Sequence, residues 1–269
     1  MTSPRELLQI QLEGWVDARG RLRDRYGVRV AVAPGSTDES PILWIGDGVP
    51  DELADVLAAA VRAAPPSIGP MELPLSIQPA QPPPAAIDAC RQLLGEVELS
   101  MGPSYVISDD VQLESTVEIV GSNAPGAVID RLRAANPGNW EPVEWDELLD
   151  GRLGPWAIAI VDGAAISICH TPVPMTAHSA ECGVWTDPRF RGRGYAAATA
   201  AAWVPLVRAP GRHLFYMTDA DNRSSQRVAA RLGAREIGWT WKLHRERPAT
   251  PKLHPLCSKM ATADPSRDL

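Results

Sequence analysis

Apolar positions along the chain fall into short runs typical of strands and longer periodic stretches typical of helices. The runs at 28–32 and 42–45 are partly β-branched and bounded by turn residues, which predicts two strands. Segment 3–24 carries apolar residues at helical spacing and predicts one helix. Segment 65–84 is rich in proline, which fixes φ and removes a backbone donor, so it predicts an extended linker.

The pattern continues to about residue 245 and is denser in the second half. Asp162-Gly163 is a two-residue turn signal between two apolar runs and predicts a hairpin. The further predicted strands are 104–107, 116–120, 156–161, 165–169, 180–186, 213–218 and 236–243, and the further helices are 50–61, 85–94, 127–135, 144–149, 192–205 and 222–232.

Strands and helices mixed in this way predict an α/β protein. We expect a smaller N-terminal α/β module over 1–112, with the Pro-rich segment inside it, and a mixed sheet flanked by helices over 113–245. A tail over 246–269, rich in Pro, Ser and charge, is expected to be flexible.

Composition excludes several classes of function. The chain of 269 residues has 26 Lys and Arg against 33 Asp and Glu, a net charge of −7, which argues against nucleic-acid and anionic-membrane partners. No secretory signal or membrane span is predicted, and the four cysteines form no CxxC pair. We therefore expect a cytoplasmic protein with reduced thiols and no metal site.

The most informative stretch is the glycine turn, defined here as residues 187–196. It follows a predicted strand, holds Gly192 and Gly194 among three arginines, and opens an alanine-rich helix. Glycines let consecutive N–H groups point at one spot, and a helix N-terminus adds partial positive charge. The segment 187–235 has nine Arg and three Asp, a local balance of +6, so a diphosphate is the ligand that fits.

Alternatives for this turn remain open at this stage. A nucleotide P-loop requires GxxxxGK[ST], which the turn lacks. A dinucleotide fingerprint is formally matched by Gly192, Gly194 and Ala197, but it lies late in the chain and after a polar loop. An ordinary Gly-rich turn before a core helix is the third alternative.

A second motif supports a more specific assignment. Arg189-Phe190-Arg191-Gly192-Arg193-Gly194 matches the [QR]xxGx[GA] signature of the GNAT superfamily of acyl-CoA-dependent N-acetyltransferases. The segment from Asn222 to Gly233, with Asn-x-x-Ser at its start and Leu-Gly at its end, resembles the family's next helix. The resemblance covers about 115–245, and the N-terminal module could be a degenerate second copy of the same fold.

The resemblance implies an acyl-CoA site. In this family backbone amides of the turn bind the coenzyme A diphosphate, and the preceding strand pairs with the pantetheine arm. Asn222 and Ser225 match residues near the pantetheine, although Asn222 is also a good helix N-cap. The implied cofactor-binding residues are Val184, Trp185, Thr186, Arg189, Arg191, Gly192, Arg193, Gly194, Tyr195, Ala196, Asn222 and Ser225.

The chemistry requires a base, because a protonated amine cannot attack a thioester. Glu181 stands where many members of the family have their glutamate base. The usual tyrosine that protonates the leaving thiolate is replaced by Ala229, so Ser225, Tyr216 and His170 are the candidate donors.

The resemblance therefore predicts an N-acetyltransferase that moves an acetyl group from acetyl-CoA directly to a primary amine. The acceptor is a small molecule or a peptide, and a homodimer is compatible with the sequence. Because the usual tyrosine is absent, a non-catalytic acyl-CoA-binding sensor is the alternative from another class.

Overall fold

The computed structural model describes residues 2–24, 27–34, 40–65 and 83–245. Contacts group these residues into two compact units. The first unit holds the described residues up to Val106, together with Met217–Arg227 and those from Arg235 on. The second unit holds Ile107–Tyr216 and Val228–Ala234.

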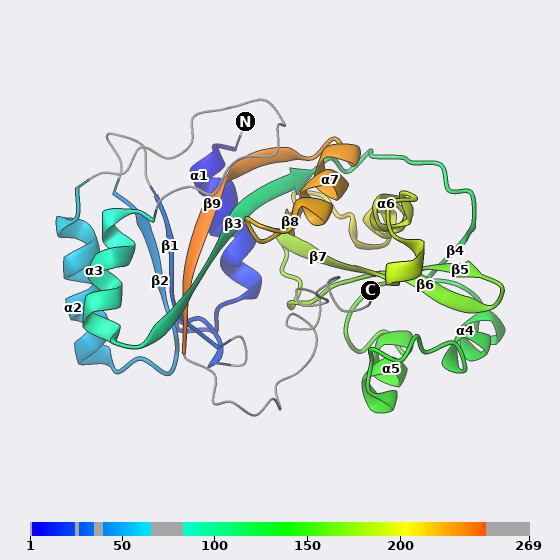
Figure 1. Ribbon diagram of the computed structural model, residues 1–269, viewed down its shortest axis with the longest axis horizontal. Helices are drawn as coiled ribbons and strands as arrows, with labels where there is room; N and C mark the ends of the chain where they lie inside the picture. The colour runs from blue at the N-terminus through cyan, green and yellow to red at the C-terminus, as the bar shows by residue number, and fades with distance from the viewer. Residues whose placement is uncertain (1, 25–26, 35–39, 66–82, 246–269) are drawn as a thin grey trace, which may run out of the picture. The chain divides into compact units, whose positions relative to one another are not determined.

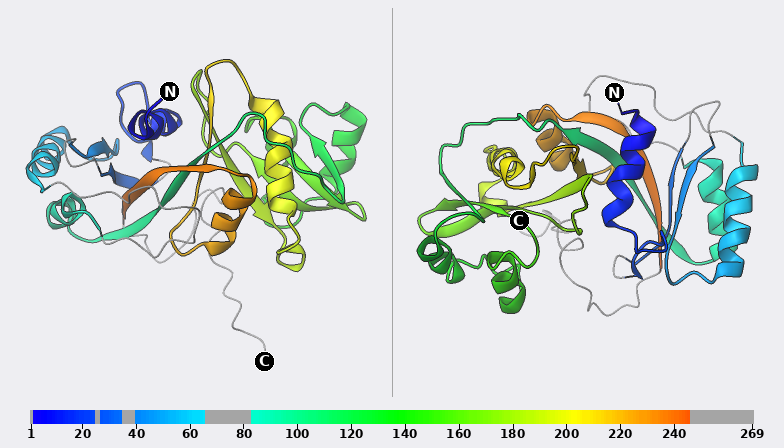
Figure 2. Two further views of the ribbon diagram at one scale, coloured as in Figure 1. Left: turned by 90° about the horizontal axis from the view of Figure 1, so that it is seen from above. Right: turned by 180° about the vertical axis from the view of Figure 1, so that it is seen from behind.

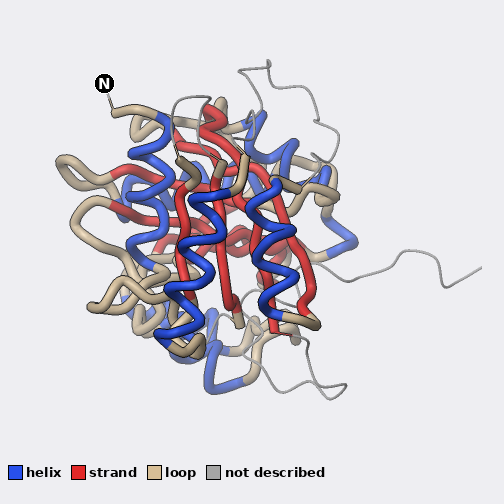
Figure 3. Tube along the Cα trace, turned by 90° about the vertical axis from the view of Figure 1, so that its left-hand side faces the viewer, coloured by secondary structure: helices blue, strands red, loops and turns tan. Residues whose placement is uncertain are grey.

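The first unit is built on four antiparallel strands. Their order is β2 (Ile42–Ile45), β1 (Val28–Ala33), β9 (Arg235–Arg245) and β3 (Val97–Ile107). Helices α2 (Asp51–Ala63) and α3 (Ala85–Leu94) lie side by side over these strands (Figure 3). Their apolar faces pack on strand residues of one face in a buried cluster that includes Leu57, Ile87, Trp239, Trp241 and Leu243.

The opposite face of this sheet contacts the N-terminal helix α1 (Pro4–Gln11). Gly238 alternates with Trp239 along β9, and a Cβ atom built on it would lie 2.9 Å from Cδ1 of Leu8. Glycine at this position therefore allows α1 to approach the strand closely.

The prediction of one helix over 3–24 is wrong beyond its first part. α1 ends at Gln11, a 3₁₀ turn covers Leu12–Gly14, and the chain then folds back through a bridge between Val16 and Leu22. The Asp17 carboxylate accepts hydrogen bonds from the backbone N–H groups of Arg19 and Arg21. These hydrogen bonds to the Asp17 side chain stabilise a turn where the helix was expected to continue.

The second unit is built on five strands in the order β8 (His213–Met217), β7 (Ser179–Thr186), β6 (Ala164–His170), β5 (Ala157–Val161) and β4 (Glu118–Gly121). Only β7 and β8 are parallel; the other neighbouring pairs are antiparallel. The hairpin predicted at Asp162-Gly163 is confirmed, with φ of 49° and 78° at the two turn residues.

Helices cover both faces of this second sheet. Helix α6 (Tyr195–Val207) lies on one face, and α4 (Gly126–Arg133) and α5 (Pro142–Leu149) lie on the other (Figures 1 and 2). The last helix, α7 (Arg223–Arg231), has residues in both units.

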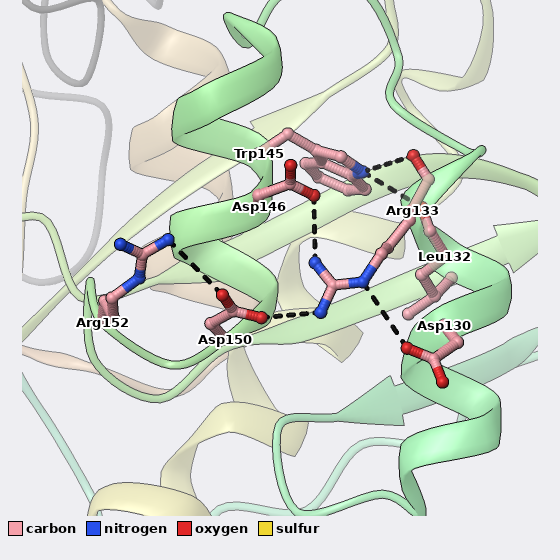
Figure 4. A network of polar contacts seen from close by, with 7 residues as sticks. All are labelled: Asp130, Leu132, Arg133, Trp145, Asp146, Asp150 and Arg152. Atoms are coloured by element: carbon pink, nitrogen blue, oxygen red, sulfur yellow. Dashed lines mark hydrogen bonds and ion pairs between the residues drawn. The ribbon is translucent and has the colours of Figure 1, made fainter.

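A polar cluster joins α4 to α5 (Figure 4). The Arg133 guanidinium donates to Asp146 at 3.0 Å and to Asp150 at 2.6 Å, and these carboxylates raise its pKa. The indole N–H of Trp145 donates to the Leu132 carbonyl at 3.0 Å and satisfies an acceptor at the end of α4. The two short helices therefore act as one layer over the sheet.

The predicted fold class is confirmed: the chain is a mixed α/β protein, and most predicted elements appear within a few residues of their expected bounds. The predicted segments 1–112 and 113–245 stay a prediction, and β9 is grouped by its contacts with the first unit. Most of the Pro-rich segment and the whole tail 246–269 lie outside the described residues. No helix in the described part of the chain has the length and apolarity to cross a membrane.

Candidate functional site

The end of β7 is paired on one side only. Its parallel register with β8 runs from Ser179 to Cys182 and stops there, whereas its antiparallel register with β6 continues to Thr186. Along a strand, successive backbone groups alternate between the two sides. Within 183–186, two residues therefore point their N–H and C=O groups away from β6. On that side no described strand pairs with them.

The glycine turn follows immediately. Asp187 caps a short 3₁₀ helix, Pro188–Phe190, by accepting from the Arg189 backbone N–H at 2.9 Å. Gly192 and Gly194 then adopt left-handed φ angles of 76° and 87°. Glycine reaches this region without the steric cost that other residues pay, which explains why both positions are glycine.

The turn leads into the N-terminus of α6 with no side-chain cap. Gly194 is the N-cap residue, and the first helical hydrogen bond runs from the N–H of Ala198 to its carbonyl. The N–H groups of Tyr195, Ala196 and Ala197 therefore have no acceptor within the helix. Together with the helix dipole they form a site suited to an anion.

The three arginines of the turn have different environments. Arg189 donates to both oxygens of Asp187, at 3.1 and 2.7 Å, and holds the pKa of that carboxyl below its usual range. Arg191 donates through Nε to the Thr186 carbonyl at 3.2 Å. The Cζ atom of Arg193 lies 5.4 Å from the Phe190 ring centroid, a cation–π distance. Arg191 and Arg193 are exposed and pair with no carboxylate among the described residues, so their charge is available to a ligand.

A fourth arginine at this turn was not singled out from the sequence. Arg231, in the last turn of α7, reaches Gly194: a Cβ atom built there would lie 2.5 Å from Nη1 and 2.6 Å from Cζ. No local sequence pattern signals this contact, because it joins residues that are distant along the chain. Only the excess of arginine over 187–235 pointed toward it.

Glu181 and His170 share one face of the second sheet. His170 is paired with Gly183, and Glu181 lies two residues before Gly183 on β7, so the side chains of His170 and Glu181 point to the same face. The face is the one covered by α4 and α5, since Ile168 packs there and lies two residues before His170 on β6. Diagonal neighbours of this kind are about 7–8 Å apart. Both residues are buried, and Glu181 is 5% exposed.

His170 has an unusual environment. Its ring lies edge-on to Trp140, with centroids 5.2 Å apart, and neither ring nitrogen has a hydrogen-bond partner of ordinary geometry among the described residues. Burial lowers the pKa of His170 to about 4, against a smaller opposing effect of the Gly183 backbone. The imidazole is therefore neutral at pH 7.

Tyr216 lies on the opposite face. It is paired with Cys182, which alternates with Glu181 along β7, so it points to the side covered by α6. Tyr216 therefore does not share a face with Glu181. Cys169 is on the α6 side as well, and burial raises the pKa of its thiol well above the usual value.

The predicted residues of the Asn motif belong to the first unit. The Asn222 side chain accepts from the Ser225 backbone N–H at 3.0 Å, so Asn222 does act as the N-cap of α7. This capping role neither excludes nor tests a contact with a cofactor. Ala229, at the position of the usual tyrosine, is fully buried in the second unit.

No group of three or more His, Cys, Asp or Glu side chains in the described ranges is arranged to hold a metal ion.

Comparison with known proteins points to one family. The family model described as an acetyltransferase (GNAT) domain matches residues 126–235. No curated protein matches the chain.

Several solved structures are similar in part. A GNAT-family protein from Novosphingobium aromaticivorans is 23% identical over 64% of this chain and 72% of its own, with a TM-score of 0.43. A GCN5-related N-acetyltransferase-like protein from Streptococcus suis is 16% identical over 80% of this chain and 83% of its own, with a TM-score of 0.42. A tandem GNAT protein from the clavulanic acid biosynthesis pathway is 16% identical over 80% of this chain and 77% of its own, with a TM-score of 0.44. Identities and TM-scores this low say nothing of the acceptor or the mechanism of this protein.

Proposed function

We propose that the protein transfers an acetyl group from acetyl-CoA to a primary amine, and the match of residues 126–235 to the acetyltransferase (GNAT) domain supports this proposal. The reaction passes through a ternary complex, in which the amine nitrogen attacks the thioester carbonyl. A new C–N bond forms, the C–S bond breaks, and coenzyme A leaves as the thiolate.

The observation that carries this proposal is that two possible binding features, the one-sided end of β7 and the glycine turn, follow each other directly along the chain. The one-sided end of β7 offers backbone N–H and C=O groups to an extended amide chain, which is the chemistry of pantetheine. It leads directly into the glycine turn and the uncapped N-terminus of α6, which suit a diphosphate. An acyl-CoA carries these two groups in the same order.

We propose Glu181 as the general base. A free amine of pKa near 10.4 is almost entirely protonated at pH 7, so a carboxylate must accept its proton before or during attack. Glu181 lies on β7, two residues before the one-sided segment begins, and faces the α4–α5 side. The transfer to Glu181 runs directly or through one water.

Direct transfer is favoured over a cysteine acyl-enzyme. A thiol acts as a nucleophile in its thiolate form, and burial raises the pKa of Cys169 well above its usual value. Absence of the usual tyrosine at Ala229 is compatible with turnover, because a thiol of pKa about 8.5 leaves readily without full protonation. Among the candidate donors, His170 shares the face of Glu181, whereas Tyr216 does not.

Release of the coenzyme A thiol with a panel of small amines and N-terminal peptides tests the proposal. We expect turnover with at least one class of primary amine, and loss of turnover with retained acetyl-CoA binding in Glu181→Gln. Glu181→Asp is the matched control, which keeps the charge and shortens the reach.

A second candidate follows from Ala229. Without the usual tyrosine, the domain could bind acyl-CoA as a sensor and not turn it over. Tight acetyl-CoA binding with no thiol release on any amine favours this sensor, and failure to bind acetyl-CoA at all contradicts both candidates.

A further inference from the structure

The unpaired polar atoms in the interior of the second unit belong to four residues. In the described part of that unit, five buried side-chain N or O atoms have no hydrogen-bond partner of ordinary geometry. They are both ring nitrogens of His170, the indole nitrogens of Trp140 and Trp156, and the amide oxygen of Asn139. We call these four residues the unpaired cluster. Buried polar atoms are normally paired, because each has lost its hydrogen bonds to water, so this concentration requires an explanation.

Three rings of the unpaired cluster lie together on the sheet. The Thr171 hydroxyl donates to the Pro155 carbonyl at 3.1 Å, so the alignment of β6 with the chain before β5 continues past the ladder and brings Trp156 opposite His170. The ring of Trp140 lies edge-on to His170, with centroids 5.2 Å apart. Both indoles pack in the buried cluster under α4 and α5, which is the face of His170.

The unpaired cluster lies beside the proposed base. The His170 ring covers its strand partner Gly183, since a Cβ atom built there would lie 3.1 Å from Cε1 of the imidazole. Glu181 lies two residues before Gly183 on the same face, and diagonal neighbours of this kind are about 7–8 Å apart. An acceptor whose amine reaches Glu181 therefore has its next few atoms close to His170.

The unpaired cluster combines donors and acceptors without a charge. Two indole N–H groups and one imidazole N–H are donors, while the other imidazole nitrogen and the Asn139 oxygen are acceptors. A carboxylate pairs only with the donors, an ammonium group only with the acceptors, and an alkyl chain with neither. A neutral amide pairs with both, because its carbonyl accepts and its N–H donates.

The loop 134–141, between α4 and α5, covers the unpaired cluster and carries Asn139 and Trp140. The Asn136 amide donates to the Trp140 carbonyl at 3.0 Å, and the Gly138 N–H donates to the Asn136 oxygen at 2.9 Å. These hydrogen bonds lie within the loop and are kept if it moves as a unit. Because the five atoms are buried, an acceptor reaches them only after such a movement takes Trp140 off the His170 ring.

We propose that the unpaired cluster binds a neutral amide next to the amine of the acceptor, so that the protein acetylates amino amides. The inference rests on the proposed function, since it names the class of acceptor for the same reaction. His170 is thereby a specificity-determining residue and not the proton donor to the leaving thiolate. The shared chemistry has two sources, a free amino amide and the N-terminus of a peptide.

Thiol release from acetyl-CoA by the full chain, measured with four amines, tests this proposal. Glycinamide carries the amide, isobutylamine is its apolar analogue of similar shape, glycine is its carboxylate analogue, and triglycine amide extends it into a peptide. The kcat/KM for each amine is measured in the wild type, His170→Phe, Trp140→Phe and Trp145→Phe. Trp145 is the matched control, because it is buried in the same apolar cluster but its indole N–H already donates to the Leu132 carbonyl at 3.0 Å.

The deciding quantity is the ratio of kcat/KM for glycinamide to that for isobutylamine. Phenylalanine keeps a ring and removes the nitrogens, so we expect this ratio to fall at least about tenfold in His170→Phe and about threefold in Trp140→Phe. Trp145→Phe should keep the ratio within twofold of the wild type. A loss of stability or of acetyl-CoA binding affects both amines equally and cancels in the ratio.

An unchanged ratio in His170→Phe overturns the inference. An equal loss of kcat with both amines overturns it as well and assigns His170 to the leaving thiolate. The wild type should also favour glycinamide over glycine, since a carboxylate leaves the acceptors of the unpaired cluster without partners. A KM for triglycine amide at least about tenfold below that for glycinamide identifies a peptide acceptor, and equal values identify a small amino amide.

Failure of the two proposals can be told apart. If the wild type releases thiol with no primary amine, the proposed function fails. If it acetylates amines without preferring glycinamide to isobutylamine and glycine, only the proposed acceptor class fails. Should His170→Phe not fold, as judged by its circular dichroism, Trp140→Phe and the preference of the wild type still decide the question.

Discussion

Buried His170 should make the stability of this protein depend on pH. The residue is 1% exposed, and its ring lies edge-on to Trp140 and has no ordinary hydrogen-bond partner among the described residues. Burial lowers its pKa from 6.5 to about 4 in the native state. Between these values the unfolded chain binds a proton that the native state does not, so stability falls as pH is lowered from 6.5 toward 4.

The size of the effect follows from the shift. A depression of about 2.5 pKa units corresponds to about 3 kcal/mol of unfolding free energy once pH is below 4, and to about 2 kcal/mol at pH 5. Above pH 7.5 neither state holds the proton and the effect vanishes. Against the stability of an ordinary domain, roughly 5–15 kcal/mol, this loss is large.

The assay is urea unfolding of the wild type and His170→Leu at pH 5.0, 7.5 and 8.5. Leucine fills similar space without titrating, so its steric cost is the same at every pH and cancels in the difference. From pH 7.5 to 5.0 the wild type should lose about 2 kcal/mol more than the variant, whereas the two should run parallel from pH 7.5 to 8.5. Equal losses over the lower range would refute a buried neutral histidine.

Three further predictions concern activity and stability. Glu181→Gln should lower thiol release at least about 100-fold while the Kd for acetyl-CoA stays within twofold; a matching rise in Kd would argue against a base. Trp156→Ala, which removes a fully buried indole, should cost about 3–5 kcal/mol in urea unfolding, and a cost below 1 kcal/mol would contradict the described core. Gly102→Ala would place a Cβ atom on the Thr218 carbonyl oxygen and should cost about 1–3 kcal/mol or more, whereas Gly126→Ala, with open space around it, should stay near the wild type.

Local patterns were sufficient to predict most elements. Short, partly β-branched apolar runs marked β1 and β2. The turn signal Asp162-Gly163 marked the β5–β6 hairpin, and both of its residues adopt the left-handed angles that such a turn requires. The helix expected over 3–24 was wrong because the Asp17 side chain bonds two backbone N–H groups and turns the chain. The spacing of apolar residues carries no information on such side-chain hydrogen bonds, which compete with the backbone hydrogen bonds of a helix.

The candidate site was predictable where it is local in sequence. The glycine turn could be located from its composition and its place before an Ala-rich helix. In the structure both glycines have left-handed φ angles, which glycine reaches without steric cost. The contact of Arg231 with Gly194 could not be predicted, because it depends on how α7 packs. The shared face of Glu181 and His170 likewise depends on strand register, which one strand alone does not determine.

The central claim, that the glycine turn binds the acyl-CoA diphosphate, is tested most directly at Gly192. Titration calorimetry of acetyl-CoA compares the wild type with Gly192→Glu and Gly192→Gln. Both variants carry the same backbone strain and enter the same open space, and only glutamate adds a negative charge. The account predicts binding to the wild type and a much larger loss with Glu than with Gln; equal affinities for the two variants, or no binding to the wild type, would contradict it.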